Sequence, residues 1–283
     1  MRRPPMLRFR LAVLAAALLW STAGAAIKLS SLSAWQLSSG RSLVAAAILF
    51  LAFPRGRRLP SRRALGAACA YAATVTLFVI ANKLTTSANA IFLQDTAPLW
   101  VLLLSPFLLG ERARRDELWA VPIFLVGLGL FFVDRLAPGQ ALGNAVALLS
   151  GVAFAGTIMG LRAVSEEGPA VLVAGNVIAG LVSLPRAFFG PEPTATDVGL
   201  VAFLGVFQLG LAYTLFQYGL RKTPAIEASL LILIEPVLNP VWTWLLAGEV
   251  PGRFALWGGA IILAGCVWRT VAAARTPRAG VPA

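Results

Sequence analysis

Two stretches of this chain share one pattern: SANAIFLQDTAPLWVLLLSPFLLGER, residues 87–112, and AIEASLLILIEPVLNPVWTWLLAGEV, residues 225–250. Aligned at an offset of about 138 residues, they pair Pro98 with Pro236 and Gly110 with Gly248. The chain around them is 58% hydrophobic. A repeat of this size in a membrane protein indicates two related halves, and carriers built this way bind substrate between the halves. The sequence therefore predicts a carrier.

Composition excludes several other classes of protein. Only 13% of the residues are charged and the mean hydropathy is +0.80, whereas soluble domains are about a quarter charged. The net charge of +12 comes from short basic clusters between apolar runs, which is typical of membrane topology signals. We expect no nucleic-acid partner. The chain has no histidine, so it lacks the usual zinc ligand and general base. We expect no cofactor, no metal and no enzyme activity. Cys69 and Cys266 lie within apolar runs, so we expect them to be small buried apolar side chains.

Hydropathy predicts an all-α membrane protein, because about 20 apolar residues cross a bilayer as one helix. Ten such runs occur, approximately at 9–28, 34–53, 63–82, 88–109, 116–134, 141–161, 169–189, 197–218, 225–247 and 253–272. They divide into a first half, residues 1–136, and a second half, residues 137–283. Five helices per half is an odd number, so the two repeats enter the membrane from opposite sides and are inverted around a central cavity.

The distribution of positive charge predicts the orientation. Placing the N-terminus in the cytoplasm puts 18 of the 24 Lys and Arg residues on the cytoplasmic side, as the positive-inside rule requires. Both termini are then cytoplasmic. A competing interpretation takes residues 1–25 as a signal peptide cleaved near Ala23-Gly24-Ala25, which leaves nine helices.

Charged side chains inside an apolar span are costly and usually face a cavity or a partner. Four of the charged residues within the predicted spans stand out: Arg41, Asp95, Glu227 and Glu235. Arg41 and Asp95 lie at equal depth in helices that enter from the same side, about 10 Å below the surface at ~1.5 Å per residue. Equal depth and opposite sign predict an ion pair, with a structural or a gating role.

Polar and aromatic side chains recur on one face of several spans. Glu235, Asn239 and Trp242 share a helix face near the midplane. Pro98 and Pro236 each remove an intrahelical hydrogen bond, and interrupted helices at matching places in two repeats point to a transport site. A cavity framed by aromatic rings, amides and hydroxyls suits amphipathic organic solutes. The predicted substrate-binding residues are Trp20, Tyr71, Phe78, Asn82, Phe154, Gln208, Tyr213, Gln217, Glu235 and Asn239, and the predicted gating residues are Pro98, Pro236, Arg41 and Asp95.

These features together resemble the drug/metabolite transporter superfamily, in its EamA branch. The resemblance rests on ALLWSTAG at 17–24, on Arg41 early in the second span, and on the paired segments that begin APLW at 97–100 and EPVL at 235–238. It covers residues 9–272, and the whole looks most like the YddG-type exporters of aromatic amino acids. Relatives often carry Glu before the proline in both halves. Ala97 stands there in the first half, which argues against a symmetric carboxylate mechanism.

The resemblance implies an exporter of the bacterial inner membrane that works by alternating access. Helices 1, 3, 4, 6, 8 and 9 would surround the cavity, helices 5 and 10 would pack outside, and the segments at Pro98 and Pro236 would move. Carried over from the family, the substrate contacts would be Trp20, Phe78, Asn82, Phe154, Tyr213 and Gln217.

Several alternatives stay open at this point. We expect a monomer in the bilayer that exports aromatic or other neutral amino acids and related small amphipathic metabolites. Export is either passive or coupled to protons through Asp95, Glu227 or Glu235. Efflux of drugs or cations, or another metabolite cargo on the same fold, is the alternative function. A channel is a further alternative, which a saturable uptake assay would separate from a carrier.

Overall fold

The computed structural model describes residues 7–111, 121–130 except 124 and 128, 141–248 and 250, and nine positions between 253 and 268. The helices within the continuous parts are α1 (Leu7–Trp20), α2 (Ala23–Leu29), α3 (Ala34–Ala52), η1 (Pro54–Arg57), α4 (Arg62–Leu84), α5 (Ser87–Gln94), α6 (Ala97–Leu108), α8 (Ala141–Ala163), η2 (Ser165–Glu167), α9 (Gly168–Ala187), α10 (Ala195–Phe203), η3 (Leu204–Leu211), α11 (Ala212–Leu220), α12 (Ala225–Leu231), η4 (Ile232–Ile234) and α13 (Glu235–Ala247). The described residues contain no strand.

Eight helical segments in the described part are long and apolar enough to cross a membrane, and each matches a predicted span to within a few residues. They are Leu7–Leu29, Ala34–Ala52, Arg62–Leu84, Ser87–Leu108, Ala141–Ala163, Ser165–Ala187, Ala195–Leu220 and Ala225–Ala247. The bundle turns large apolar side chains outward, among them Phe107, Leu181 and Leu245. An apolar exterior of this kind is suited to lipid. The predicted spans 116–134 and 253–272 lie largely outside the described residues, so the number ten stays a prediction.

The two echoed segments run in opposite directions through the bundle. At the start of α1, the side chain of Arg10 pairs with Glu227 in the first turn of α12. At the end of α2, Lys28 Nζ donates to the carbonyl of Thr85, just before α5. The segment that begins at Ser87 and the one that begins at Ala225 therefore enter from opposite ends.

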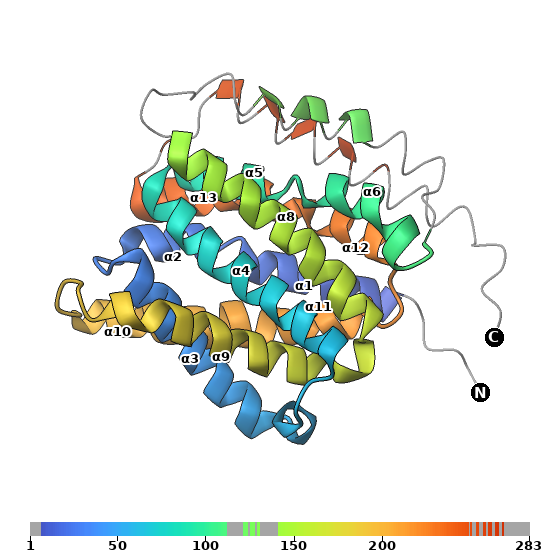
Figure 1. Cartoon of the computed structure of the whole chain (residues 1–283). Helices are drawn as coiled ribbons and strands as arrows, with labels where there is room; N and C mark the ends of the chain where they lie inside the picture. Colours follow the sequence, from blue (N-terminus) through green and yellow to red (C-terminus); the bar gives the residue numbers. More distant parts are fainter. Residues whose placement is uncertain are drawn as a thin grey trace.

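Helices of the two predicted halves pack mainly against each other (Figure 1). The main contacts between the predicted halves join α4 with α8 and α9, α3 with α9 and η3, α1 with α11, α5 with α8, and α2 with α13. The contacts follow the predicted repeat. The contact of α4 with α8 corresponds to that of α11 with α1, and the contact of α5 with α8 corresponds to that of α13 with α2. The core therefore forms at the junction of the halves rather than inside each of them.

Four of the spans are interrupted or irregular near their middle. The first breaks between α1 and α2 at Ser21 and Thr22, and the fourth breaks between α5 and α6 at Asp95 and Thr96. The segment between α12 and α13 tightens into the 3₁₀ turn η4, and η3 is a π-helical stretch between α10 and α11. π-Helical stretches are uncommon and often mark functional positions.

The echoed glycines end the echoed helices in the same way. Gly110 follows α6 with φ of 67°, and Gly248 caps α13 with φ of 70°. Glycine adopts this left-handed conformation without a steric penalty, which explains its use directly after a helix.

The prediction that Cys69 is buried is wrong. Its side chain is exposed on α4, and the sequence pattern misled because a surface suited to lipid is as apolar as the core. Cys266 lies outside the described residues.

Candidate functional site

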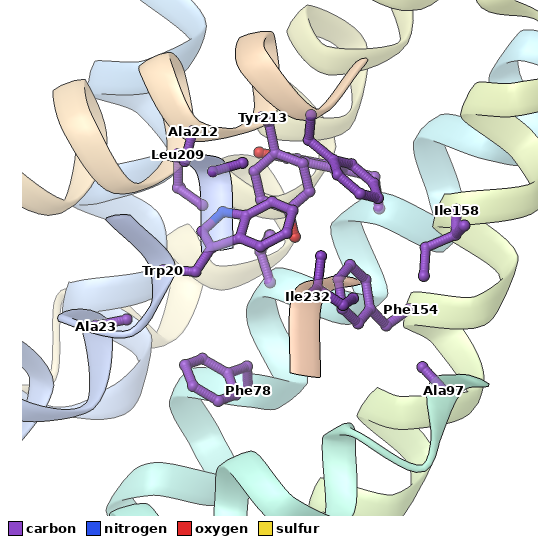
Figure 2. Packing of buried hydrophobic residues seen from close by; sticks show 14 of the residues in the cluster. Trp20, Ala23, Phe78, Ala97, Phe154, Ile158, Leu209, Ala212, Tyr213 and Ile232 are labelled. Atoms are coloured by element: carbon purple, nitrogen blue, oxygen red, sulfur yellow. The ribbon is translucent and has the colours of Figure 1, made fainter. Parts of the chain in front are cut away.

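Aromatic rings from four helices meet at the centre of the bundle (Figure 2). The ring of Trp20, at the end of α1, lies 4.6 Å from that of Tyr213 in α11 and 5.6 Å from that of Phe154 in α8. Phe78 of α4 points toward the same centre. Trp20 and Phe154 are counterparts in the predicted sequence repeat, so the two predicted halves would contribute matching residues to one cluster.

This cluster borders a central cavity of about 20 Å³, enough for roughly one water molecule. Seven of the predicted site residues line it: Trp20, Arg41, Phe78, Phe154, Gln208, Tyr213 and Glu235. The remaining lining residues are Thr74, Val75, Gln94 and Leu209. These predicted residues therefore meet at one cavity, and their roles in binding stay predictions. An organic solute cannot occupy this space unless the surrounding helices move apart.

Arg41 is the only arginine buried to 1% exposure in the described bundle, and it reaches this cavity from α3. Its guanidinium donates to Gln208 Oε1 at 3.1 Å and to the carbonyl of Val75 at 2.5 Å. Gln208 stands in the π-helical stretch η3. Arg41 Nε is buried and has no hydrogen-bond partner, so one donor is left for another group.

The predicted ion pair between Arg41 and Asp95 is not formed. Both carboxyl oxygens of Asp95 are buried without a hydrogen-bond partner, while Arg41 bonds to Gln208 and Val75. The prediction matched the two groups by depth, but depth does not fix the direction in which each helix turns its side chains. Asp95 instead interacts electrostatically with the buried carboxyl of Glu235.

The centre of the molecule thus holds one cation and two acidic groups, none of them in an ion pair. Leaving a buried polar atom unpaired costs about 1–3 kcal/mol, and ionisable groups retained inside a membrane at such a cost usually serve function. Arg41, Asp95 and Glu235 are therefore the main candidates for charge recognition.

Besides Gln217, three predicted substrate-binding residues are buried but stand outside the cavity lining. Tyr71 packs its ring against Tyr213 at 4.5 Å and accepts a hydrogen bond from Asn176. Asn82 donates to the carbonyl of Phe78, and its own oxygen has no partner. Asn239 donates to Ser87 Oγ at 3.2 Å. These side chains support the wall of the cavity or lie between the cavity and one end of the bundle.

Gln217 was predicted to bind substrate, and the structure places it away from the central cavity. It donates to the carbonyl of Ser165 and lines a second cavity near the end of the bundle. Gln217 is four residues, or about one turn, beyond Tyr213 on the same face of α11. A shared face thus does not guarantee a shared cavity.

Pro98 and Pro236 both lie in the first turn of a new helix, α6 and α13. The sequence predicted interrupted helices at these two prolines, and each proline does stand directly after an interruption of its span. At the first turn no intrahelical partner is needed for the missing N–H, so proline fits there at little cost. The freed carbonyl of Gln94 lies against Gly151 of α8.

One end of the bundle is closed by a polar network, here called the clasp, made by Ser30, Ser31, Lys83, Thr194 and Asp197. The Asp197 carboxylate accepts hydrogen bonds from Ser30 Oγ at 2.6 Å, from the N–H and Oγ of Ser31, and from Thr194. Lys83 Nζ donates to the carbonyl of Ser30 at 2.8 Å. The clasp joins the two predicted halves, since Asp197 belongs to the second and its serine partners to the first.

The opposite end, here called the arginine-rich end, carries Arg10, Arg55, Arg162 and Arg221. Arg162 pairs with Glu111 at 2.9 Å, and Glu111 also accepts from the N–H of Ala225. Glu227 was predicted as an intramembrane charge, but it pairs with Arg10 at this end at 2.6 Å. Ion pairs between the halves therefore close the arginine-rich end.

Among the residues at the site that were not predicted, three have clear contacts. Gln94 lines the cavity and donates to Ser150, Asn176 holds Tyr71, and Phe216 packs 5.0 Å from Trp20. Gln94 directly precedes Asp95, and Asn176 is a lone amide in an apolar span. Both signals were present in the sequence. Phe216 carried no signal beyond its position one turn from Tyr213.

A profile of the EamA-like transporter family matches residues 9–133 and again residues 141–270. The chain belongs to the EamA-like transporter family. It is therefore a multi-pass membrane transporter, in agreement with the eight described spans. An EamA-type transporter also fits the arrangement found here, in which buried ionisable groups lie at a closed centre.

Curated relatives support the same assignment. An uncharacterized transporter of Archaeoglobus fulgidus is 31% identical over 74% of this chain and 77% of its own length. The pseudopaline exporter CntI of Pseudomonas aeruginosa is 27% identical over 64% of each chain. The threonine/homoserine exporter RhtA of Escherichia coli is 31% identical over 66% of this chain and 64% of its own. These relatives are named transporters or exporters rather than enzymes.

A solved crystal structure shares the fold. It superposes with a TM-score of 0.75 at 21% identity and covers 94% of this chain and 98% of the other. At this identity the likeness concerns the fold alone.

Proposed function

We propose that this EamA-family transporter exports neutral amino acids and related zwitterionic metabolites by alternating access. Relatives named as exporters of threonine and homoserine and of pseudopaline support an amino-acid-like cargo. The observation that carries the proposal is the unpaired charge around the central cavity, where Arg41 and Glu235 both reach the lining.

A zwitterionic amino acid complements these charges. Its carboxylate would take the free Nε of Arg41, which is the residue of choice for planar carboxylate recognition. Its ammonium would bind Glu235 or Asp95. Both carboxyl oxygens of Asp95 lack a hydrogen-bond partner. Binding would then supply a partner to Arg41 and to one of the two acidic groups.

The aromatic wall determines which side chains fit. Trp20, Phe78, Phe154 and Tyr213 line the cavity, and aromatic rings contact apolar groups or other rings. The proposed substrates range in size from threonine-like amino acids to aromatic amino acids, which YddG-type exporters carry. The cavity of about 20 Å³ represents a closed state that must widen for either.

The two-repeat mechanism draws support from packing. The echoed segments run in opposite directions, as the pairs Arg10–Glu227 and Lys28–Thr85 indicate. The family profile also matches the chain twice. We therefore infer two inverted halves, residues 1–136 and 137–283, that rock about the centre while the clasp and the arginine-rich end open in turn.

The arginine-rich end is proposed to face the cytoplasm of a bacterial inner membrane, since the positive-inside rule places clustered arginines there. Both termini are then cytoplasmic, and the monomer is the working unit. Reporter fusions at the two termini test the orientation, and fusions on opposite faces of the membrane would contradict it.

Counterflow in proteoliposomes tests the proposal. Vesicles loaded with one amino acid are assayed with phenylalanine, tryptophan, threonine and homoserine, each beside its decarboxylated amine and its deaminated acid. Zwitterions should be transported, and both truncated analogues should fail, because each leaves a buried charge unpaired. Loss of a buried charge partner costs about 2 kcal/mol or more, roughly 30-fold in apparent affinity.

The matching variants are Arg41→Gln, Asp95→Asn and Glu235→Gln, with Arg63→Gln as the control. Arg63 is exposed in the first turn of α4. We expect Arg41→Gln to weaken amino-acid transport by roughly 30-fold. The thermal unfolding midpoint should be unchanged or higher, because Arg41 has no charged partner to lose and a buried charge is costly. Equal transport by Arg41→Gln and Arg63→Gln would refute charge recognition by Arg41.

A second candidate function is efflux of organic cations. It is favoured by the presence of two acidic groups, Asp95 and Glu235, against one arginine at the centre. In the same assay, transport of the decarboxylated amines without the amino acids would select this candidate.

A further inference from the structure

A second cavity of about 480 Å³ lies at the arginine-rich end, between the last turn of α3, η1, and the facing ends of α9 and α11. This volume falls within the roughly 300–1,000 Å³ that small-molecule sites occupy. It shares no lining residue with the central cavity. It is therefore a separate site and not an extension of the proposed transport centre.

One wall of this cavity is apolar. Leu49 of α3 and Leu172 of α9 are buried there, and Phe53 stands beside them at the end of α3. Leu51, two residues beyond Leu49 on α3, points away from the bundle and is 71% exposed. The apolar wall is thus adjacent to a surface suited to lipid.

The polar side of the cavity is cationic. Arg55 and Arg221 line it, and no acidic residue does so. Arg221 Nε is buried without a hydrogen-bond partner. Arg55 has only a 3.8 Å pair with Glu166 between side chains exposed to 65% and 81%, and exposed pairs of this kind contribute little. Both arginines therefore have donors available for an anion.

We propose that this cavity binds an anionic phospholipid, with the head-group phosphate on Arg221 and Arg55 and the start of an acyl chain along Leu49, Phe53 and Leu172. A free phosphate would use the arginines but would leave the apolar wall in water. A basic pocket between membrane helices on the cytoplasmic side is typical of anionic lipid sites. The inference does not depend on which cargo the central site carries.

Native mass spectrometry of the full chain tests the site. The protein is titrated in detergent with phosphatidylglycerol and with phosphatidylethanolamine of the same acyl chains. We expect preferential retention of phosphatidylglycerol and a fall of about fivefold for each of Arg221→Gln and Arg55→Gln, since a basic residue contributes roughly one such factor to anionic lipid binding. Thr214→Phe, which fills the cavity and keeps both arginines, should also reduce retention.

Arg62→Gln is the matched control, because Arg62 is an exposed arginine at the same end that does not line the cavity. Equal retention of the two lipids, or an equal loss with Arg62→Gln, would overturn the proposal. Soluble glycerol 3-phosphate distinguishes the sources of the anion. If it displaced phosphatidylglycerol as well as another phospholipid does, the site would bind a head group only and the lipid assignment would be wrong.

Discussion

Burying the guanidinium of Arg41 without a charged partner makes the folded state less stable than it would be with an apolar residue at this position. The guanidinium is buried with one donor unpaired, and the acidic groups at the centre, Asp95 and Glu235, are not bonded to it. A core optimised for stability alone would replace these groups with apolar residues of similar size. Their retention is explained if a cargo supplies the missing partners during part of each transport cycle.

The close packing of helices at the centre also depends on glycines. A Cβ added at Gly151 would lie 2.7 Å from Thr96 Oγ1 and 2.8 Å from the carbonyl oxygens of Gln94 and Leu93. Gly24 is similarly confined by Ser87 and Asn239. Gly151 thus lets α8 pack directly on the break between α5 and α6.

We predict that Gly151→Ala destabilises the protein by about 1–3 kcal/mol, the usual cost of overpacking a fixed core. The added methyl group would meet backbone oxygens, which cannot turn away as a flexible side chain does. Thermal unfolding in detergent measures the effect.

Gly66→Ala is the matched control for this substitution. Gly66 lies in α4 with no atom within 4 Å of an added Cβ, and alanine favours a helix over glycine by about 1 kcal/mol. Its unfolding midpoint should be unchanged or slightly higher. An unchanged midpoint for Gly151→Ala would show that α8 can shift and that the packing is not rigid there.

At the scale of elements, the broken helices are the parts suited to movement. The breaks before α6 and before α13 stand next to the central cavity, and each is followed by a proline in the first helical turn. Because a break interrupts the ladder of backbone hydrogen bonds, the two parts of a span can change their relative angle at low cost. A π-helical stretch in the span that carries Gln208 adds a further irregular point.

We predict that Pro98→Ala and Pro236→Ala slow transport by about tenfold, equivalent to roughly 1.4 kcal/mol of barrier. Alanine restores an N–H that can bond the carbonyl of Gln94 or Ile232, so the helix can continue through the break. The unfolding midpoint should be unchanged or higher. Initial rates of counterflow measure the change.

Pro106→Ala serves as the control, since Pro106 lies inside α6, about two turns beyond the break. Its transport rate should stay close to that of the unaltered chain. Full transport rates for both break variants would mean that the closed centre opens by rigid movement of whole spans instead.

At the scale of the whole molecule, both ends are held by contacts between the predicted halves. The clasp joins Ser30 and Ser31 to Asp197, and at the arginine-rich end Arg10 pairs with Glu227 and Glu111 with Arg162. Alternating access requires that these two sets open in turn. Their relative strength then determines which end is open more of the time.

We predict that Asp197→Asn opens the clasp end. An amide has one acceptor oxygen and no charge, so it cannot replace the bonds that the carboxylate accepts from Ser30, Ser31 and Thr194. Losing one charge-assisted hydrogen bond contributes roughly 1.5 kcal/mol, about a tenfold shift in population. The readout is the rate at which a membrane-impermeant maleimide labels a reporter Asn82→Cys.

The labelling experiment needs a background without the native thiols Cys69 and Cys266, because Cys69 is exposed. Glu166→Gln is the control at the other end, where Glu166 makes only an exposed pair with Arg55. Faster labelling with Asp197→Asn alone supports the clasp. Equal labelling rates in Asp197→Asn and Glu166→Gln would show that the clasp does not act as a gate.

Much of this architecture follows from the sequence. Apolar runs long enough to cross a bilayer determine the eight described spans, and the repeated Pro and Gly positions mark where the broken helices restart and end. The residue types at the centre, among them Trp20, Arg41 and Glu235, were also identifiable, because polar and aromatic side chains in an apolar span have few other uses. These features are local in the chain or depend only on depth in the membrane.

Only the tertiary structure decided the partners. Arg41 bonds to Gln208, 167 residues away, rather than to Asp95 at the same depth, and Gln217 lines a separate cavity although it shares a helix face with Tyr213. Hydropathy and spacing fix the height of a residue, but the rotation of each helix is set by packing across the two halves. Because that packing joins residues far apart in the chain, no pattern within one segment determines it.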